Sequence, residues 1–326
     1  MIECRNLGKS YGTVQAVTEI SLSLDEHEFL SILGPSGCGK STLLRLIAGL
    51  EVPSQGQVFL HGQEISGRKI ILPPERRKFG MIFQDFALFP HLSVKDNVGY
   101  GATGSKKEKQ QRVHELLELV SLPHLATKMP HQISGGEQQR IAVARALAPR
   151  PRLILMDEPF SNLDYQLRQQ LRRDIREILK HEGVATVLVT HDQVEAITFS
   201  DRMLLMQKGK VVQEGTPAEI YQNPQTIWAS SFVGEANHLP VEWQNDSLKT
   251  PLGELNVPFE IGRNARIMMV RPEDFKLESV PADQANGIVK SVDFSGSVQN
   301  VGVLLKSGAS VQVSGSPHLL WNQDDS

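Results

Sequence analysis

Hydrophobic residues in the first two thirds of the chain fall in short runs that alternate with segments of helical spacing. Residues 29–33 form a mostly apolar segment that ends at a glycine-rich turn, and residues 153–156 and 184–189 are continuous apolar runs. Such runs are typical of strands buried on both faces of a mostly parallel sheet. The pattern predicts an α/β fold, with residues 203–206 as a further short buried strand.

Two helices are predicted between these strands. The residues after the glycine-rich turn are apolar at positions 43, 44, 47 and 48, which is helical spacing. A longer helix has one apolar face, formed by Leu167, Leu171, Ile175 and Ile178. We expect Asp164 to cap the start of this helix and Gly183 to follow its end.

The pattern changes near Gly234, and helical periodicity largely disappears after residue 239. Residues 287–292 and 301–305 are predicted as strands, and residues 311–313 alternate between apolar and polar. We therefore expect two domains, covering residues 1–235 and 236–326, of which the second is a small, barrel-like β domain.

Length and composition agree with this division. The 326 residues correspond to about two domains, and 40% hydrophobic residues are enough for a sizeable core. A net charge of −3 gives no support to nucleic-acid binding through bulk charge. The chain has neither an apolar run of about 18 residues nor a signal-peptide core, so we expect no membrane span. Cys4 and Cys38 are too few for a disulfide framework, which favours a reducing compartment.

Residues 34–41, Gly-Pro-Ser-Gly-Cys-Gly-Lys-Ser, match the phosphate-loop pattern between a predicted strand and a predicted helix. Backbone N–H groups and the helix N-terminus can face phosphate oxygens there. We expect Lys40 to reach the β- and γ-phosphates and Ser41 to bind Mg²⁺. The alternative is a chance glycine-rich turn. We interpret the Cys38 side chain as a small group that only fills space within the phosphate loop. The alternative is a thiol that senses redox conditions.

A second candidate site is the end of the apolar run at residues 153–156, where Asp157 and Glu158 follow. Adjacent acids at a buried strand end are costly unless a cation compensates them. We expect Asp157 to hold Mg²⁺, and Glu158 to orient or deprotonate a water that attacks the γ-phosphate. The alternative is a structural acid pair at a surface turn.

A second glycine-rich turn, residues 134–140, precedes another predicted helix. It offers backbone N–H groups and the Ser134 hydroxyl to a phosphate. One γ-phosphate does not need two anion-binding turns from the same chain. This turn is therefore expected to serve the nucleotide of a partner chain.

Together these motifs resemble those of the ATP-binding subunits of ABC transporters, over about residues 1–235. Residues 34–42 resemble the Walker A loop, and Gln84 resembles the glutamine of the Q-loop. Residues 134–138 resemble the family signature, except that Glu137 stands where glutamine is more usual. Its added carboxylate is expected to weaken phosphate approach slightly. The resemblance implies a P-loop NTPase cassette with a helical subdomain, followed by a small all-β, OB-like domain.

The resemblance also implies a role for each matching residue. The implied catalytic residues are Glu158, the switch histidine His191, and Gln84, and the implied Mg²⁺ ligands are Ser41, Gln84 and Asp157. Residues 161–164 resemble the D-loop, in which Ser161 and Asp164 are the matching positions. Tyr11 is similar to the residue that stacks on adenine, with Val17 beside it. The residues implied to bind ATP are Tyr11, Val17, Gly34, Pro35, Ser36, Gly37, Cys38, Gly39, Lys40, Ser41, Thr42, Ser134, Gly135, Gly136 and Glu137.

The partners follow from the same resemblance. Two such chains are expected to face each other head to tail, with each ATP between the Walker A loop of one and the signature of the other. Two membrane permease subunits and, indirectly, a periplasmic or extracellular binding protein complete the assembly, at the cytoplasmic face of a bacterial inner membrane. Residues 84–90 are expected to help dock the permease. Alternatively, their apolar side chains simply pack inside the helical subdomain.

The transported substrate is inferred from the β domain and from the chain as a whole. Residues 268–274 resemble a phrase of the β domain (TOBE-like) appended to many import ATPases, and the whole chain most resembles ferric-iron import ATP-binding proteins. Importers of spermidine, sulfate, thiamine, phosphonate and sugars share much of the pattern. Three competing interpretations are a soluble non-transport ABC ATPase, an exporter and an inactive regulatory cassette. The histidines and cysteines show no metal-ligand spacing, so no iron site is expected in this chain.

Overall fold

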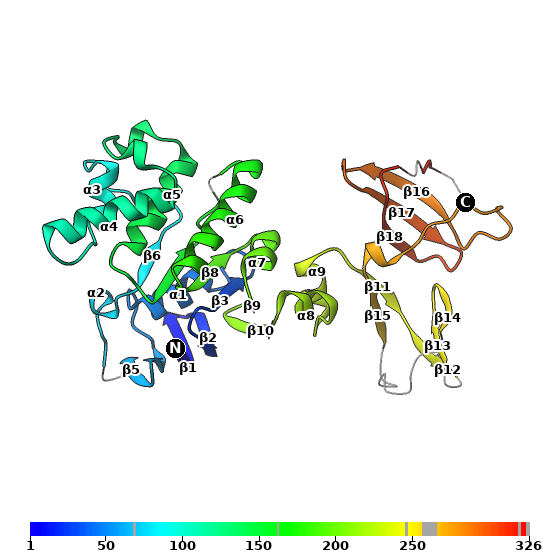
Figure 1. The fold of residues 1–326 in the computed structure, drawn as a ribbon. Coiled ribbons are helices and arrows are strands. Elements are labelled where there is room, and N and C mark those ends of the chain that lie inside the picture. Colours follow the sequence, from blue (N-terminus) through cyan, green and yellow to red (C-terminus); the bar gives the residue numbers. More distant parts are fainter. Residues whose placement is uncertain (68–69, 162, 245–246, 256–265, 319–320, 324–326) are drawn as a thin grey trace. The chain divides into compact units, whose positions relative to one another are not determined.

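The structure is a computed structural model that describes residues 1–326 except 68–69, 162, 245–246, 256–265, 319–320 and 324–326. The chain forms two compact units, Met1–Asn223 and Pro224–Ser326 (Figure 1). The predicted domain boundary after residue 235 lies further along the chain than this division, so that α9 (Ile227–Val233) belongs to the second unit.

A six-stranded sheet forms the centre of the first unit, in the order β10-β9-β3-β8-β7-β6. All its neighbouring strands are parallel except β9 and β10. Every residue of β3 and β8 is buried, as their continuous apolar runs predicted. The strands are β3 (Phe29–Leu33), β6 (Gly80–Ile82), β7 (Leu153–Asp157), β8 (Ala185–Thr190), β9 (Arg202–Gln207) and β10 (Lys210–Gly215).

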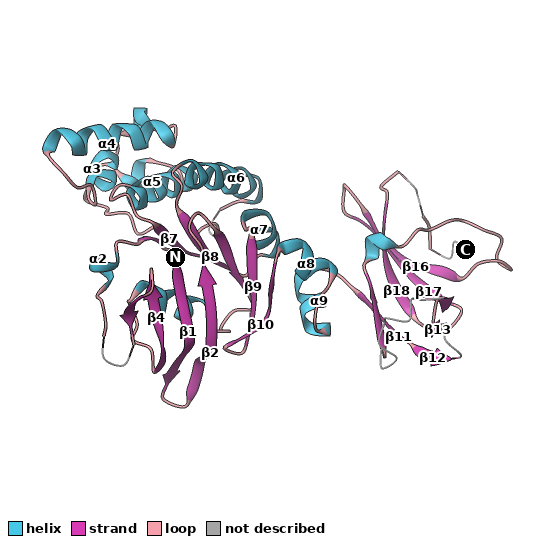
Figure 2. Cartoon of the chain, turned by 60° about the horizontal axis from the view of Figure 1, so that its bottom comes forward, coloured by secondary structure: helices cyan, strands magenta, loops and turns pink. Residues whose placement is uncertain are grey.

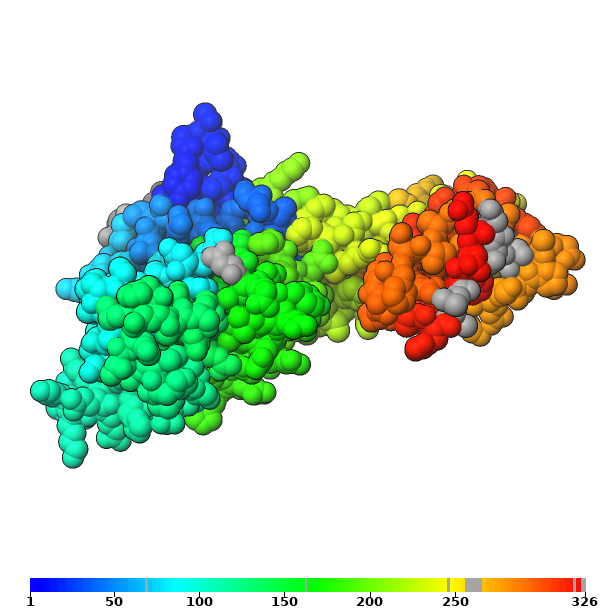
Figure 3. Space-filling view, turned by 90° about the horizontal axis from the view of Figure 1, so that it is seen from above, coloured from blue at the N-terminus to red at the C-terminus, as the bar shows by residue number. Residues whose placement is uncertain are grey.

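An antiparallel sheet in the order β2-β1-β4-β5 forms the second layer of this unit. Apolar side chains of both sheets and of helix α1 (Lys40–Ala48) form one continuous core. The hairpin of β1 and β2, dark blue in Figure 3, projects from this unit. The strands are β1 (Ile2–Tyr11), β2 (Val14–Leu24), β4 (Gln55–Leu60) and β5 (Gln63–Ser66).

Helices form a second core on the other face of the central sheet (Figure 2). Asp164 caps α6 by accepting a hydrogen bond from the Leu167 N–H at 3.0 Å, and Gly183 after it has a left-handed φ of 65°, so both predicted helix signals are confirmed. The helical elements of the unit are α2 (Pro74–Arg77), α3 (Val94–Gly99), α4 (Lys106–Leu119), η1 (Pro123–Leu125), η2 (Pro130–Gln132), α5 (Gly135–Leu147), α6 (Tyr165–His181), α7 (Gln193–Phe199) and α8 (Pro217–Gln222).

Among the described residues, the part of the second unit after α9 is all-β apart from one turn of 3-10 helix, η3 (Pro272–Asp274), which confirms the predicted fold class. Its described strands form sheets in the orders β11-β15, β12-β13-β14 and β16-β17-β18, with an apolar core that includes Val289, Val301 and Val313. The strands are β11 (Asn237–Pro240), β12 (Glu242–Gln244), β13 (Ser247–Thr250), β14 (Gly253–Leu255), β15 (Ile267–Val270), β16 (Gly287–Phe294), β17 (Gln299–Leu305) and β18 (Ser310–Gly315). Within the described ranges of both units, the helices are too short or too polar to cross a membrane.

Candidate nucleotide-binding site

The predicted phosphate loop connects the end of β3 to the start of α1. Its glycines permit a path that other residues would block. Gly39 has a φ of 105°, and a Cβ atom at this position would lie 2.0 Å from the Ala16 carbonyl oxygen. The loop is thus held tightly against the start of β2 while its backbone turns into the helix.

Lys40, the first residue of α1, is only 4% exposed. Its Nζ donates hydrogen bonds to the carbonyl oxygens of Gly34, at 2.8 Å, and Pro35, at 3.1 Å. Two of the three ammonium N–H donors therefore hold the loop in place. The ammonium group is fixed beside the backbone N–H groups at the positive end of the α1 dipole, which is an arrangement suited to phosphate.

The next residue, Ser41, connects the loop to the acidic end of β7. Its hydroxyl donates to Asp157 Oδ1 at 2.8 Å. Burial raises the pKa of Asp157 above its usual range, and the hydrogen bond from Ser41 only partly opposes this effect. A half-buried carboxylate next to a hydroxyl is a set of hard oxygen donors, and a divalent cation would offset the cost of its burial. The two residues therefore fit Mg²⁺.

Glu158 and His191 form a second polar pair at the same sheet edge. His191 Nδ1 lies 2.9 Å from Glu158 Oε2, and the backbone N–H of Glu158 donates to the Val189 carbonyl oxygen at 2.9 Å. A carboxylate is an acceptor, so Nδ1 carries the shared proton. Glu158, directly after β7, has a left-handed φ of 47°, which is rare for a non-glycine residue.

Gln84 follows β6 at this edge as well. Ile82 of β6 pairs with Met156 of β7, so that the backbone at Gln84 lies beyond the strand ends, as Glu158 does. The Gln84 side chain is exposed. Sequence and register together thus bring Gln84 to the edge that carries Asp157, Glu158 and His191.

A pocket of about 350 Å³ lies over the phosphate loop. It brings together Ser36, Gly37, Gly39, Lys40, Ser41, Thr42 and Glu158. Its lining also contains residues that sequence reasoning missed, namely Val14, Gln15, Ala16, Lys208 and Gly209. The turn at Gly209 holds the phosphate loop in place, because the Gly209 N–H donates to the Cys38 carbonyl oxygen at 2.9 Å. Lysine followed by glycine signals only a turn, so nothing in the sequence linked this hairpin to the phosphate loop.

Tyr11 and Val17 stand at the edge of this region. Tyr11 is 44% exposed at the end of β1, and the Lys9 Nζ lies 4.9 Å from the centre of its ring. Val17 is only 2% exposed and packs in the core between the sheets. Their contact with adenine stays a prediction.

The signature turn lies at the start of α5, and its residues do not line the phosphate-loop pocket. Ser134 caps the helix, and Glu137 Oε2 accepts hydrogen bonds from the Ser134 N–H, at 2.7 Å, and from its hydroxyl, at 2.8 Å. The first of these bonds lowers the pKa of Glu137. Glu137 thus has a structural role in a capping box. Its carboxylate would compete with a phosphate for the hydrogen bond from the Ser134 hydroxyl.

The D-loop is held close to the catalytic candidates. The Ser161 hydroxyl donates to the Glu158 carbonyl oxygen at 3.0 Å. Arg168, which sequence reasoning also missed, donates to the Leu163 carbonyl oxygen at 2.9 Å and forms an ion pair with Asp192 at 3.4 Å. Arg168 therefore joins the D-loop to the segment that carries His191. Asn162, the remaining D-loop position, lies outside the described residues.

Phe86 and Cys38 are both buried side chains. Phe86 is 6% exposed and packs in the helical core, so the alternative of internal packing holds for this residue. Cys38 is 5% exposed, and burial raises the pKa of its thiol. The thiolate is the reactive form, so this environment does not favour redox sensing.

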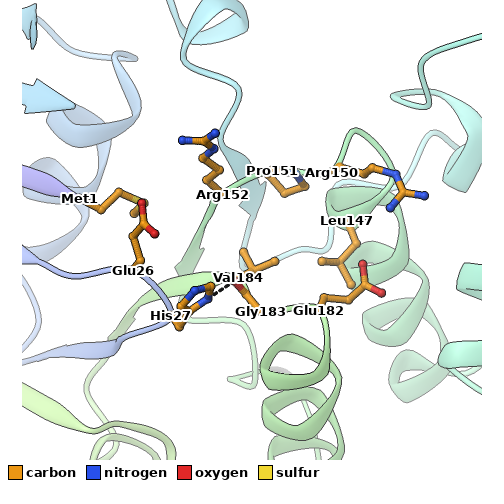
Figure 4. A pocket seen from close by; sticks show the side chains of 10 residues that line it. All are labelled: Met1, Glu26, His27, Leu147, Arg150, Pro151, Arg152, Glu182, Gly183 and Val184. Carbon is orange, nitrogen blue, oxygen red and sulfur yellow. Dashed lines mark hydrogen bonds between the residues drawn. The ribbon is translucent and has the colours of Figure 1, made fainter. Parts of the chain in front are cut away.

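Other hollows of the first unit lie away from the phosphate loop. A pocket of about 370 Å³ at the amino-terminal ends of β7 and β8 is lined by both charged and apolar residues, including Glu26, Arg152 and Glu182 (Figure 4). A wider groove of about 720 Å³ lies between α3, α4 and η1 and has Tyr100, Val113 and Leu117 in its lining. Among the described residues, no group of three or more His, Cys, Asp or Glu side chains is placed to hold a metal ion.

A phosphate loop at the carboxyl end of one strand, with an acidic residue at the end of a nearby parallel strand, is the arrangement of P-loop nucleotide-binding proteins. The family model described as ABC transporter matches residues 17–161. The chain is 44% identical over 299 residues to the Fe(3+) ions import ATP-binding protein FbpC of Pseudomonas fluorescens, covering 90% of this chain and 84% of that protein. This chain therefore belongs to the ABC transporter family.

Further relatives extend the comparison. The spermidine/putrescine import ATP-binding protein PotA of Mesorhizobium japonicum is 41% identical over 96% of this chain and 89% of its own length. The dimeric ATP-binding cassette MJ0796 bound to ADP and Pi is 33% identical, with a TM-score of 0.58 over 67% of this chain and 99% of that chain. The cbiO1 structure from Clostridium perfringens is 29% identical, with a TM-score of 0.63 over 68% of this chain and 90% of that chain.

Proposed function

We propose that this chain is the ATP-hydrolysing subunit of a bacterial ABC importer, and that the imported substrate is ferric iron. One observation carries the enzymatic part of the proposal: Lys40, Ser41 and Glu158 line a single pocket. In addition, Ser41 is hydrogen-bonded to Asp157, and Glu158 is hydrogen-bonded to His191. Groups that bind phosphate and a group that can accept a proton thus meet at one place.

The phosphate-binding part of the mechanism follows from Lys40 and the start of α1. Lys40 brings a fixed positive charge to the terminal phosphates, and the backbone N–H groups at the start of α1 bind their oxygens. Ser41 and Asp157 would hold Mg²⁺, with Gln84 as a further oxygen ligand from the adjacent strand end. Mg²⁺, when bound, neutralises part of the negative charge on the phosphates.

Glu158 and His191 perform the proton chemistry in this proposal. The Glu158 carboxylate orients the attacking water and takes its proton, which contributes about 10²–10⁴ in rate. His191 donates its Nδ1–H to this carboxylate and thereby fixes its orientation. The other ring nitrogen, Nε2, can donate to a γ-phosphate oxygen only when the ring carries a second proton.

Two copies of the chain are needed for a complete site. The signature residues do not line the phosphate-loop pocket of their own chain, so the Ser134 turn is available to a nucleotide held by a second copy. The dimeric cassettes among the similar structures support this arrangement. ATP would then favour the closed dimer through its higher affinity for that state.

The proposed site for the permease is the groove between α3 and α4 together with residues 84–90. Partly exposed apolar side chains such as Tyr100 and Val113 line this groove next to the Gln84 turn. Docking there places the chain at the cytoplasmic face of the inner membrane, with the substrate delivered by a separate binding protein. The cassette is proposed to comprise residues 1–235 and the TOBE-like β domain residues 236–326.

Ferric iron is favoured as the substrate because several relatives that are 39–44% identical to this chain are Fe(3+) ions import ATP-binding proteins. Polyamine import is the second candidate, because the similarity to PotA is nearly as high. A strain without this gene would be complemented with the wild-type chain and tested for uptake of radiolabelled ferric iron and of radiolabelled spermidine. Restored iron uptake supports the proposal, whereas restored spermidine uptake alone replaces it with the second candidate.

The same strain provides a matched control for the role of ATP hydrolysis. Glu158→Gln should fail to restore uptake. Glu177→Gln, an identical change at an exposed position of α6, should restore it fully. Uptake restored equally by both variants would contradict the proposed role of the ATPase site.

A further inference from the structure

The turn after Gln84 has an unusual backbone. Phe86 and Ala87 are consecutive non-glycine residues with left-handed φ values of 61° and 47°. Each such residue is strained, and the strain persists only where surrounding contacts over-determine the conformation. The turn must therefore be held by specific partners.

Arg145 is the partner on the inner side of this turn. Its guanidinium donates to the carbonyl oxygens of Ala87, at 2.6 Å, and of Phe86, at 2.9 Å. The same group lies 5.3 Å from the centre of the Phe89 ring. One planar fork thus fixes both strained peptides and the aromatic residue that follows them.

The charge of Arg145 has no carboxylate partner among the described residues; the bonds found are to backbone carbonyl oxygens. Its side chain is half-buried, and burial lowers the pKa of the guanidinium. A partly desolvated cation that is neutralised by carbonyl dipoles depends on its geometry. Lysine, which is a point charge without a planar fork, would not reproduce these contacts.

Arg145 lies near the end of α5, the helix that begins directly after Ser134. This helix has 13 residues and is about 20 Å long, so it transmits a shift of its end to the signature turn as a rigid body. The end of α5 also packs against the strand before Gln84, since a Cβ atom on Gly80 would lie 3.0 Å from the Ala146 carbonyl oxygen.

The outer side of the same turn faces the proposed docking groove. Phe89 packs against Tyr100, which lines the groove, with ring centres 4.5 Å apart and ring planes tilted by 42°. Asn97 of α3, which is fully buried, accepts from the Phe89 N–H at 2.8 Å. Phe89 therefore connects the groove to Arg145.

We propose that Arg145 is a positioning residue that joins the turn after Gln84 to the signature helix, so that Gln84 and Ser134 move as one unit. The proposal rests on the proposed ATPase function, because it assigns Arg145 to the geometry of hydrolysis. It adds a link between the surface that meets the permease and the turn that meets the partner's nucleotide.

The test compares Arg145→Met and Arg145→Lys with Arg176→Lys in the purified full-length chain. Arg176 is a matched control on α6, because it also donates to a backbone carbonyl oxygen, that of Phe199 at 2.8 Å, and lies 5.3 Å from the centre of the Phe29 ring. ATP affinity, kcat and KM for hydrolysis, and thermal stability are measured for each variant.

Both Arg145 variants are expected to lower kcat by about tenfold or more and to leave ATP affinity within about twofold, because their phosphate loop is intact. Arg176→Lys should keep kcat within about twofold of the wild type. Full activity in Arg145→Met, or rescue by Arg145→Lys, would overturn the proposal. The lysine variant keeps the charge and so answers the question if the methionine variant does not fold.

A second readout does not depend on hydrolysis. Hydrogen exchange in peptides covering residues 134–141 should be faster in Arg145→Met than in the wild type, because the helix loses its fixed end. Unchanged exchange there, with faster exchange confined to residues 84–89, means a purely local role and overturns the proposal. A wild-type chain without ATPase activity would count against the proposed function, and hydrogen exchange would then decide the role of Arg145.

Discussion

Arg77 provides a quantitative test of how the phosphate-loop helix is held. This arginine is 2% exposed, and its partners are the carbonyl oxygens of Leu46, Ile47, Ile65 and Leu72, at distances from 2.7 to 3.3 Å. Two of these carbonyls belong to the last turn of α1, where a positive charge also interacts favourably with the helix dipole. Arg77 therefore anchors the far end of the helix that begins with Lys40.

The size of the effect follows from these contacts. Hydrogen bonds from a charged donor contribute about 1.5 kcal/mol each at the lower end of their range, and four give about 6 kcal/mol. Burial lowers the pKa of Arg77 to about 10, which corresponds to a desolvation cost of about 3 kcal/mol. The net contribution is thus about 3 kcal/mol, and Arg77→Met should lower the free energy of unfolding of the first unit by that amount.

Urea denaturation measures this change and contains its own control. All three tryptophans, Trp228, Trp243 and Trp321, lie in the second unit, so their fluorescence follows that unit alone. Far-UV circular dichroism follows the helices, which belong mainly to the first unit. The dichroism midpoint should fall by about 1 M urea in Arg77→Met, while the fluorescence midpoint stays constant.

Arg76→Met is the matched variant, because Arg76 is exposed on the same short helix. It should remain within about 0.5 kcal/mol of the wild type. A loss of less than about 1 kcal/mol in Arg77→Met would refute the reasoning, since four acceptors would then have lost a donor at almost no cost.

Two other predictions concern the site itself. Burial raises the pKa of the Asp157 carboxyl in the folded chain above its value in the unfolded chain. The folded state therefore binds the carboxyl proton more tightly than the unfolded state does. As pH rises from the unfolded pKa through the folded pKa, the nucleotide-free chain loses this contribution to its stability. Asp157→Asn should therefore raise the melting temperature of the nucleotide-free chain at pH 7 while abolishing Mg²⁺-dependent ATP hydrolysis; a lower melting temperature would contradict the assigned burial cost. Gly39→Ala places a Cβ atom 2.0 Å from the Ala16 carbonyl oxygen and should weaken ATP binding by about 100-fold or more in a calorimetric titration, and unchanged affinity would show that the loop does not need this path.

Features fixed by local sequence were predicted well. The strand at residues 153–156, the helix cap at Asp164 and the phosphate loop each depend on neighbouring residues, and the structure has all three. The Ser134 turn was expected to meet a phosphate, but sequence alone did not show that Glu137 completes a capping box with it. That carboxylate was expected only to hinder phosphate approach.

Features fixed by long-range contacts escaped prediction for a physical reason. Arg77, Arg145 and Arg168 look like ordinary helix arginines in the sequence, because their carbonyl partners follow from the fold and not from residue type. The left-handed backbone of Glu158 has no sequence signal either, since glutamate rarely adopts it.

In the second unit, a local motif can be recognised from the sequence, but the strand pairing cannot. The residues around Val270 form a recognisable sequence motif, but this motif does not indicate which strand pairs with β15. In the structure Asn237 and Val270 are paired residues of β11 and β15, and Asn237 also bonds to the Gln312 backbone of β18. Asn237 thus ties three strands of the second unit together, which no local pattern predicts.

The central claim is that Glu158, held by His191 beside the phosphate loop, is the group that activates water for ATP hydrolysis. The most direct measurement is the turnover and oligomeric state of Glu158→Gln with ATP and Mg²⁺, using light scattering coupled to size exclusion. Retained ATP binding, loss of turnover and an ATP-dependent dimer are predicted, because glutamine keeps the contacts but cannot accept the proton. Normal steady-state hydrolysis by this variant would contradict the account.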